Sequence, residues 1–269
     1  MSSPPLALPP TELHLWLCSL AAVGEDRLGR YPALLDVTDR RWVERLTRPE
    51  YQREQLVSRA LLRTVLARYL EAPPETLRFR RTERGRPELL GESGLRFSLS
   101  HTDGLVACVV AAGGELGVDV ERLRPNDLSA TVGRRYFSAA ERERLDALPA
   151  ELRAGEFFSY WVLKEAYTKA RGLGLSMGLR SFTVRLGPGE AVLEPAAGGP
   201  EVAGGDGRPG VCWLELLEPS AEHRLGIAVL NTPQAPRVVS RWIVPLGSEA
   251  PASPRVIART PPAVARREA

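Results

Sequence analysis

The repeat of apolar and polar positions is clearest over residues 157–175. Apolar side chains recur there at three- and four-residue spacing with charged residues between them, which predicts one amphipathic helix. Gly172 marks its end, because glycine readily takes the left-handed conformation that follows many helices. Glu165 and Lys169 lie four positions apart, so an acid and a base face the same way. They predict either a surface ion pair, worth roughly a few tenths of a kcal/mol, or part of a site.

The rest of the pattern alternates between helices and strands. A helical pattern runs over residues 39–70 and stops before the proline pair at 73–74. An S-x-x-E capping box at 138–141 opens another helix, and Asn126 or Asp127 can cap a short one before it. The predicted strands span residues 13–18, 77–80, 95–99, 105–110 and 116–120 and, after the helices, 181–186, 191–193, 211–217, 224–230 and 239–244.

These elements divide the chain into four regions. We expect a flexible N-terminal lead over residues 1–10, a first α+β half over 11–120, a second over 121–245, and a disordered tail rich in Pro, Ala and Arg over 246–269. A Gly- and Pro-rich excursion at 187–210 is expected to be a mobile loop. The strand connections are too short for helical crossovers, which favours mostly antiparallel sheets. The predicted fold class is α+β, with two similar halves in a pseudo-twofold arrangement, each a small sheet packed with helices, and the active site in the cleft between them.

Composition narrows the function classes. The 269 residues are 43% hydrophobic, which is enough for a real core. The sequence has neither an apolar run long enough to cross a bilayer nor a signal-peptide start, so we expect a cytoplasmic protein without membrane binding. Its three cysteines lie in apolar segments, as reduced core thiols do. With 36 basic and 33 acidic residues mostly interleaved, nucleic-acid binding is not expected, whereas a net charge of +3 suits an acidic partner.

Lysine is rare in this chain. Of the 36 basic residues two are lysines, Lys164 and Lys169, so 36 − 2 = 34 are arginines. Both lysines lie in the predicted helix at 157–175, which indicates that a compact ammonium suits that place better than a forked guanidinium. The predicted helix at 39–70 instead carries arginines on one face, and we expect most of them to be solvated: Arg45, Arg53, Arg59 and Arg63.

Two short segments bring together groups that suggest chemistry. In the strand that ends in G-V-D-V-E, alternation places Asp119 and Glu121 on the same face. Because two carboxylates repel unless a cation lies between them, they predict either an exposed face with arginine neighbours or half of a Mg²⁺ site. Ser100 and His101 stand at a strand end beside a glycine turn, where a hydroxyl, an imidazole and a backbone amide can hold phosphate oxygens.

Five motifs together resemble a known family. They are G-R-P at 85–87, F-S-L-S-H at 97–101, G-V-D-V-E at 117–121, F-S-A-A-E at 137–141 and W-V-L-K-E-A-Y-T-K-A-R-G-L-G-L at 161–175. In this order and approximate spacing they resemble the Sfp-type 4'-phosphopantetheinyl transferases over roughly residues 39–184. Each motif is weak alone, but the ordered set is specific.

The resemblance implies a magnesium-dependent transferase. Such an enzyme moves the 4'-phosphopantetheine arm of coenzyme A to a serine of an apo carrier protein, giving holo carrier protein and adenosine 3',5'-bisphosphate. The metal-binding acids of the family fall on Asp119, Glu121 and Glu165. Either Glu165 or a metal-bound water beside it is the expected acceptor of the serine proton.

The resemblance also implies residues that bind coenzyme A. The phosphate-binding lysine falls on Lys169, and the Ser-His pair falls on Ser100 and His101. The basic residue of the G-x-P turn falls on Arg86, where lysine is commoner in the family. F-S-L-S-H stands where F-N-x-S-H is frequent, which changes the neighbouring strand contact. Basic residues on the first long helix help to hold the 3'-phosphate, and Arg53 is the best candidate here.

The implied partners are carrier proteins or carrier domains of polyketide, peptide or fatty acid synthases, acted on by a monomer. We expect Arg134 and Arg135, within the segment 124–137, to lie on the surface that docks an acidic carrier. One alternative is another magnesium enzyme acting on a nucleotide diphosphate, such as a hydrolase. The other is a catalytically silent module that binds carrier protein or coenzyme A; an intact set of acids and lysine argues against it.

Overall fold

A computed structural model describes residues 6–83, 85–91, 93–124, 133–173, 177–195 and 212–261. They form two compact units: the first contains residues up to Gly113 and Arg237–Ser253, and the second contains Gly114–Pro236 and the residues from Pro254 on. The chain first crosses between units at 113–114, whereas the sequence predicted 120–121. The reason is that the strand after Gly114 pairs within the second sheet. Each unit is therefore built from two separate stretches of sequence.

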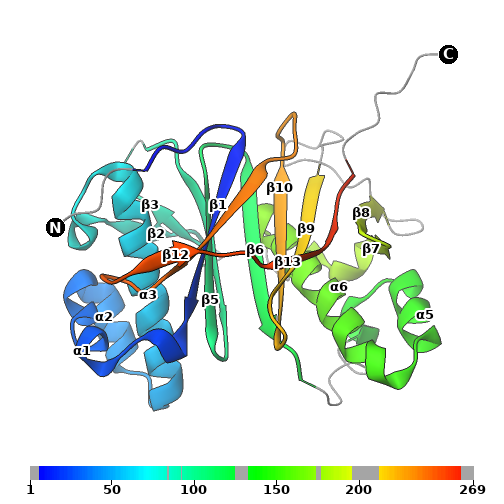
Figure 1. Cartoon of the computed structure of the whole chain (residues 1–269), viewed down its shortest axis with the longest axis horizontal. Helices are drawn as coiled ribbons and strands as arrows, with labels where there is room; N and C mark the ends of the chain where they lie inside the picture. The colour runs from blue at the N-terminus through cyan, green and yellow to red at the C-terminus, as the bar shows by residue number, and fades with distance from the viewer. Residues whose placement is uncertain are drawn as a thin grey trace. The chain divides into compact units, whose positions relative to one another are not determined.

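The first unit contains a five-stranded sheet (Figure 1). The strand order is β12 (Glu249–Pro251), β11 (Arg237–Ile243), β1 (Glu12–Ser19), β5 (Leu105–Ala111) and β4 (Arg96–Thr102). The β1 and β11 strands run parallel and the other neighbours are antiparallel. A separate antiparallel hairpin joins β2 (Phe79–Arg81) to β3 (Pro87–Leu89), with Gly85 in its turn at φ +79°. The sequence placed a turn at Gly85 and missed β3, which is only three residues long.

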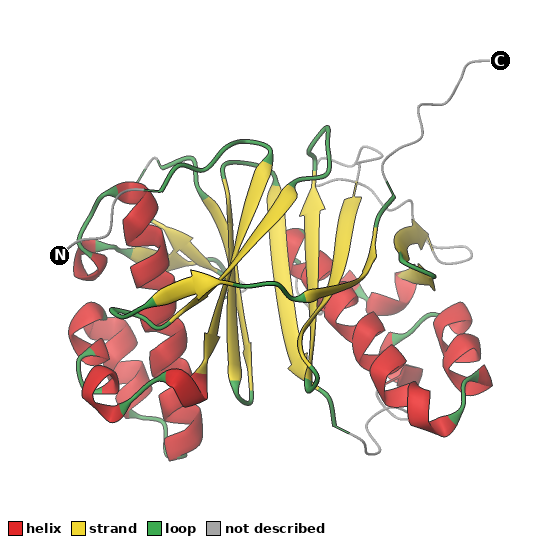
Figure 2. Cartoon of the chain, in the orientation of Figure 1, coloured by secondary structure: helices red, strands yellow, loops and turns green. Residues whose placement is uncertain are grey.

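The helices of the first unit lie on one face of its sheet (Figure 2). They are α1 (Glu25–Leu28), α2 (Val37–Glu44) and α3 (Pro49–Leu70), with short 3-10 turns at Leu20–Ala22, Tyr31–Leu34 and Pro74–Thr76. The single helical pattern predicted from residue 39 is split, because Arg48 is extended (φ −96°, ψ 116°) before Pro49, as a residue before proline prefers. Helix α3 packs its apolar face against β4 and β5.

Two arginines of α3 are not on the solvated face that the sequence predicted. Arg59 is 8% exposed and Arg63 is 1% exposed, whereas Arg45 is exposed. The prediction was wrong for these two because the helical pattern could not reveal which elements cover that face. Helix α2 and the β2–β3 hairpin supply acids and aromatic rings that accept both guanidinium groups.

The second unit contains a six-stranded sheet. Its order is β6 (Glu115–Arg122), β10 (His223–Leu230), β9 (Cys212–Ser220), β13 (Arg255–Arg259), β8 (Glu190–Pro195) and β7 (Phe182–Gly187). Residues 133–136 are helical, two longer helices follow, α5 (Ala139–Ala147) and α6 (Ala150–Ala170), and a 3-10 turn at Leu179–Ser181 leads into β7. Helix α6 packs against β6 and β10. The β6–β10, β10–β9, β9–β13 and β8–β7 pairs are antiparallel, as predicted, and the contact between β13 and β8 is parallel.

Local signals located both longer helices of the second unit. The capping box is formed: the Ser138 side chain accepts from the Glu141 amide at 3.4 Å, and the Glu141 carboxylate accepts from the Ser138 amide at 2.8 Å. Helix α6 begins earlier than the apolar repeat predicted, at Ala150, and Gly172 follows its end at φ +64°. The proposed caps at 126 and 127 and most of the 187–210 excursion lie outside the described residues.

The end of the chain differs from the expected disordered tail. Residues 249–251 form β12 at the edge of the first sheet, and residues 255–259 form β13 inside the second sheet, between β9 and β8. The sequence there lacks a strong apolar pattern, but ladder hydrogen bonds and the burial of Ala258, 2% exposed, supply the ordering energy. Among the helices described, none has the length and apolarity needed to cross a membrane.

Candidate active site

Helix α6 approaches strands β6 and β10 at backbone distance. A Cβ atom at Gly117 would lie 1.9 Å from the Ala166 carbonyl oxygen, and one at Gly226 would lie 2.5 Å from the Val162 carbonyl oxygen. Only glycine fits at both positions, because any side chain would push the helix away. The glycine of G-V-D-V-E therefore brings α6 close to the face that carries the two acids.

Asp119 lies under this helix and contacts its lysine. The carboxylate is on β6, opposite Gly226, and Lys169 Nζ donates to Asp119 Oδ1 at 2.6 Å. Asp119 is 5% exposed, so the alternative of an exposed strand face is wrong for this residue. Lys169 faces Asp119 from the last turn of α6, which also excludes the simple surface pair between Glu165 and Lys169 as its only role.

Glu165 is the acid whose electrostatics are most changed. Burial, together with the nearby Asp119 and Glu121 carboxylates, raises the pKa of Glu165 to about 7, against the partly opposing effect of the Lys169 ammonium. Its Oε1 atom is buried and makes no hydrogen bond within the part of the chain that the structure describes. Burying such an oxygen without a partner is costly, so its position points to an absent proton or cation.

The carboxylates of this cluster fit Mg²⁺ in their chemistry. Carboxylate oxygens are hard ligands, and Mg²⁺ usually takes only one or two of them and fills its shell with phosphate oxygens and water. Among the described residues, no group of three or more His, Cys, Asp or Glu side chains forms a ready-made metal centre. The arrangement is therefore a partial site in which Lys169 neutralises Asp119.

A second lysine of α6 supports the cluster from behind. Lys164 is fully buried, and its ammonium donates to the Leu179 and Phe182 carbonyl oxygens at 2.7 Å each and pairs with Glu141 Oε2 at 2.9 Å. The other Glu141 oxygen accepts from the Val184 amide at 2.7 Å. All three ammonium hydrogens thus have acceptors, and the pair joins α5, α6 and β7. The lysine pattern singled out Lys164, but its acid lies 23 residues earlier (164 − 141) and could not be assigned from sequence.

The other predicted residues lie in the first unit and are less closely grouped. His101 Nε2 lies 2.9 Å from Gln55 Nε2, and its Nδ1 lies 2.7 Å from Glu54 Oε1. Ser100, its neighbour on β4, points to the opposite face of the sheet, because side chains alternate along a strand. Arg86 donates to the Phe97 carbonyl oxygen at 3.3 Å.

Arg53 is engaged elsewhere. Its guanidinium contacts the Glu25 carboxylate and the Val23 carbonyl oxygen. Arg53 does not line the cavity that His101 and Gln55 line in the first unit. Its assignment to a phosphate therefore stays a prediction.

The first unit contains a cavity of about 920 Å³, a volume in the range of small-molecule sites. It is enclosed by the N-terminus of α2, one face of α3, the β2–β3 hairpin and the end of β4. His101 and Gln55 line it, together with four arginines and three acids: Arg59, Arg63, Arg78, Arg81, Asp36, Asp39 and Glu75. A pocket rich in guanidinium groups favours a phosphorylated ligand.

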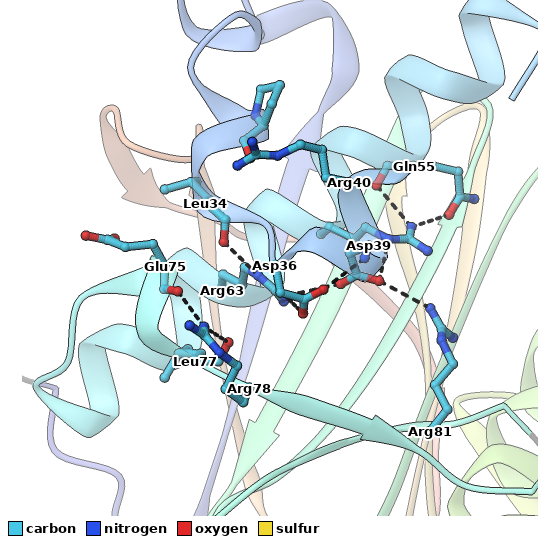
Figure 3. Close-up of polar contacts among 12 residues, drawn as sticks. Leu34, Asp36, Asp39, Arg40, Gln55, Arg63, Glu75, Leu77, Arg78 and Arg81 are labelled. Carbon is cyan, nitrogen blue, oxygen red and sulfur yellow. Dashed lines mark hydrogen bonds and ion pairs between the residues drawn. The ribbon is translucent and has the colours of Figure 1, made fainter. Parts of the chain in front are cut away.

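Figure 3 shows the polar contacts of this cavity. Asp36 and Asp39 lie side by side between Arg63 and Arg81. Arg63 binds Asp36 Oδ2 at 2.6 Å and the Leu34 carbonyl oxygen at 2.8 Å. Arg59 donates to Gln55 Oε1 at 2.6 Å, and burial lowers the pKa of its guanidinium while Asp39 opposes that shift. Sequence reasoning missed this cavity; its only local signal was the four-residue spacing of Arg59 and Arg63.

Comparison with known proteins gives the same assignment for both units. Residues 25–113 match the family described as 4'-phosphopantetheinyl transferase, N-terminal, and residues 115–224 match the 4'-phosphopantetheinyl transferase superfamily. The two matches meet where the structure divides the chain, at Gly113 and Gly114.

Individual relatives agree. The chain is 36% identical to the 4'-phosphopantetheinyl transferase HetI of Nostoc sp. over 190 residues, 70% of this chain and 79% of the relative. It is 29% identical to the 4'-phosphopantetheinyl transferase Sfp of Bacillus subtilis over 164 residues, 61% of this chain and 72% of the relative. A holo-(acyl-carrier-protein) synthase of Bacillus anthracis, solved in complex with CoA, matches 44% of this chain and 96% of its own at a TM-score of 0.36 and 20% identity, too distant to support an argument. The chain belongs to the 4'-phosphopantetheinyl transferase superfamily, as its Sfp-type motifs predicted.

Proposed function

We propose that this protein transfers the 4'-phosphopantetheine arm of coenzyme A to a serine of an apo carrier protein, with Mg²⁺ as cofactor. The observation that carries this proposal is the cluster of Asp119, Glu165 and Lys169, in which a buried glutamate has a pKa of about 7 beside a second acid and a base. Family membership supports the reaction class.

Asp119, Glu121 and Glu165 are the residues that would hold Mg²⁺. Bound there, the ion would neutralise charge on the pyrophosphate of coenzyme A and on the departing phosphate. Lys169 contributes a second positive charge. When a ligand phosphate is available, the Lys169 ammonium turns from Asp119 to that phosphate.

Glu165 is the proposed proton acceptor. The serine oxygen forms a bond to the phosphorus that carries the pantetheine arm, and the bridging P–O bond of the pyrophosphate breaks. Adenosine 3',5'-bisphosphate leaves with the bond electrons, and the serine proton goes to a Glu165 oxygen. In the metal-free protein a base with a pKa of about 7 is close to the optimum at neutral pH, because about half of it is ionised and it is still basic.

The first unit is the proposed binding region for the nucleotide end of coenzyme A. His101 lines the arginine-rich cavity. Ser100 lies beside it on β4, and Arg86 lies in the turn of the β2–β3 hairpin, which also lines the cavity. Guanidinium and imidazole groups suit a phosphate monoester. The cavity favours Arg59 and Arg81 over Arg53 as phosphate ligands, because both line it.

The proposed docking surface for the carrier protein includes Arg134 and Arg135. The described part of that surface places the Arg135 guanidinium 5.3 Å from the Tyr136 ring centre, and residues 125–132 lie outside the described residues. Reversal of both charges, R134E with R135E, raises the carrier KM with little change in the KM for coenzyme A, because an acidic carrier loses its attraction. An equal rise in both KM values would remove this surface from the proposal.

Intact-mass analysis of an apo carrier protein tests the proposed reaction. Peptide, polyketide and fatty acid carriers are each incubated with the protein, coenzyme A and Mg²⁺, and a gain equal to one phosphopantetheine arm is expected on at least one. Chelator and Asp119→Ala abolish the gain, whereas Asp146→Ala, which removes an exposed acid of α5, leaves it unchanged. Binding of coenzyme A without any mass gain would favour the silent binding module instead.

A further inference from the structure

Asp39 occupies an unusual position in the arginine-rich cavity. Three guanidinium groups from two elements contact its carboxylate: Arg59 Nε at 3.2 Å and Arg63 Nη2 at 3.2 Å from α3, and Arg81 Nη2 at 3.7 Å from β2. Its side chain is only 17% exposed, so solvent screens these contacts weakly. The Asp39 carboxylate accepts from these arginines in the same way as the oxygens of a ligand phosphate would, so the two anions can compete for the same guanidinium groups.

The neighbouring Asp36 has a different role. Its Oδ1 accepts from the Asp39 amide at 2.9 Å and so caps helix α2, while its Oδ2 holds Arg63 at 2.6 Å. The side chain of Asp39 makes no helix cap among the described residues, and its carboxylate contacts three guanidinium groups there. Asp36 therefore fixes the local backbone and Arg63, whereas Asp39 can change partners without unfolding the helix.

The arginines also differ in how firmly they are held. Arg63 is 1% exposed and keeps Asp36 and the Leu34 carbonyl oxygen whatever Asp39 does. Arg81 has a side chain that is 55% exposed, and besides Asp39 it contacts the Gly85 carbonyl oxygen at 3.0 Å. Arg59 lies between these cases, since Gln55 and the Trp42 ring also hold it. Arg81 and Arg59 are thus able to turn toward a ligand, while Arg63 stays and continues to pair with Asp39.

We propose that Asp39 is a specificity-determining residue that acts as an internal counter-anion in this cavity. It neutralises Arg59 and Arg81 in the free protein, and a phosphate monoester on the nucleotide of coenzyme A takes both arginines over. The inference rests on the proposed function, which supplies coenzyme A as the ligand. Asp39 is left next to Arg63 after the exchange, so the displaced carboxylate is not buried without a partner.

This role makes a signed prediction about affinity. A nucleotide with a phosphate monoester competes with Asp39 and is repelled by it, so removing the charge strengthens its binding. A nucleotide without that phosphate draws little on Arg59 and Arg81 and is insensitive to the change. Asp39 thus holds down the affinity for coenzyme A and narrows the preference over its dephosphorylated form.

Calorimetric titration of the full chain with coenzyme A, 3'-dephospho-coenzyme A and adenosine 3',5'-bisphosphate tests the role of Asp39. In Asp39→Asn the Kd for coenzyme A and for the bisphosphate falls by about tenfold, and the Kd for the dephospho form changes by less than about twofold. The matched control is Glu44→Gln, which removes one exposed charge from the same helix α2 and changes each Kd by less than about twofold. The two phosphorylated ligands separate the monoester from the pyrophosphate as the source of the effect.

Arg81→Ala gives a second test that does not depend on the folding of the Asp39 variant. Because Arg81 is largely exposed, the chain folds, and the Kd for coenzyme A rises about tenfold while that for the dephospho form stays within about twofold. A weaker coenzyme A affinity in Asp39→Asn, or equal changes for both ligands in either variant, overturns the inference. If the wild-type protein transfers the arm and these variants fail to discriminate, only the Asp39 inference falls; if the wild type binds neither nucleotide, the proposed function falls with it.

Discussion

The carboxylate cluster of the second unit and the arginine-rich cavity of the first use the same residue types with opposite charge balance. In the second unit Lys169 pairs with Asp119, and burial together with the Asp119 and Glu121 carboxylates raises the pKa of Glu165. In the first unit one acid, Asp39, is shared by three arginines. We propose that the excess of carboxylates suits the first of these sites to a cation, and that the excess of guanidinium groups suits the second to an anion.

The two sites also differ in what holds them in place. Two glycines let helix α6 approach β6 and β10, and the fully satisfied pair of Lys164 and Glu141 fixes the opposite side of the helix. In the cavity, the Asp36 helix cap and contacts of partly exposed side chains hold the charged groups in place, and the side chain of Arg81 is 55% exposed. The comparison predicts a rigid cation site and an adjustable anion site.

The largest expected effect concerns the support of the rigid site. Lys164→Met leaves Glu141 buried without its cation, so the free energy of unfolding falls by about 3–5 kcal/mol. Adding Glu141→Gln restores part of this loss, because the neutral amide removes the unpaired charge and its oxygen still accepts from a backbone amide. Denaturant unfolding measures both. Arg185→Met, in a pair with Glu194 that is exposed, costs less than about 1 kcal/mol and is the control; a similar cost at both places would contradict the comparison.

Glu165→Gln tests whether the excess of carboxylates serves catalysis. The variant keeps the shape of the side chain and removes the proton acceptor, so kcat falls by about 10²–10³-fold. Single-turnover transfer to a carrier protein measures it, and Glu151→Gln, at an exposed position on the same helix, leaves kcat unchanged. Near-full turnover with unchanged Mg²⁺ affinity would rule out Glu165 as the base.

The raised pKa of Glu165 predicts how stability depends on pH in metal-free protein. The pKa is about 7 in the folded state and 4.5 in the reference state, so between these values the folded state binds more protons than the unfolded state. Stability from this group is complete below pH 4.5 and is lost as the pH rises to about 7, by at most about 3 kcal/mol. Thermal unfolding in chelator measures it. Glu165→Gln flattens the profile, and a wild-type profile that coincides with that of the variant would show that folding does not raise the pKa of Glu165.

The smallest expected effect concerns Arg53. Because its guanidinium is held by Glu25 and the Val23 carbonyl oxygen, Arg53→Gln changes the Kd for coenzyme A by less than about threefold. The same calorimetric titration that is used for Arg81→Ala compares the two arginines directly. A larger loss of coenzyme A affinity for the Arg53 variant than for the Arg81 variant would instead assign phosphate binding to Arg53, the residue that the family resemblance favoured.

The sequence by itself determined the elements and site residues that depend on local patterns. The apolar repeat located α6, the capping box located the start of α5, and strand alternation placed Asp119 and Glu121 on one face. These features follow from the geometry of a single helix or strand, which depends on neighbours a few residues away. The ordered motifs were specific enough to indicate the family that the comparisons confirm.

Only the tertiary structure decided the features that join distant parts of the chain. Burial of Arg59 and Arg63, the contacts of Asp39 and the pKa of Glu165 each depend on elements that the local pattern does not relate. The strands at 249–251 and 255–259 formed where composition predicted disorder, because neighbouring strands offer backbone hydrogen bonds to a segment with little apolar character of its own. Charge balance and strand pairing depend on which elements pack against one another. The sequence pattern shows which side chains each element carries, but not which other element they contact.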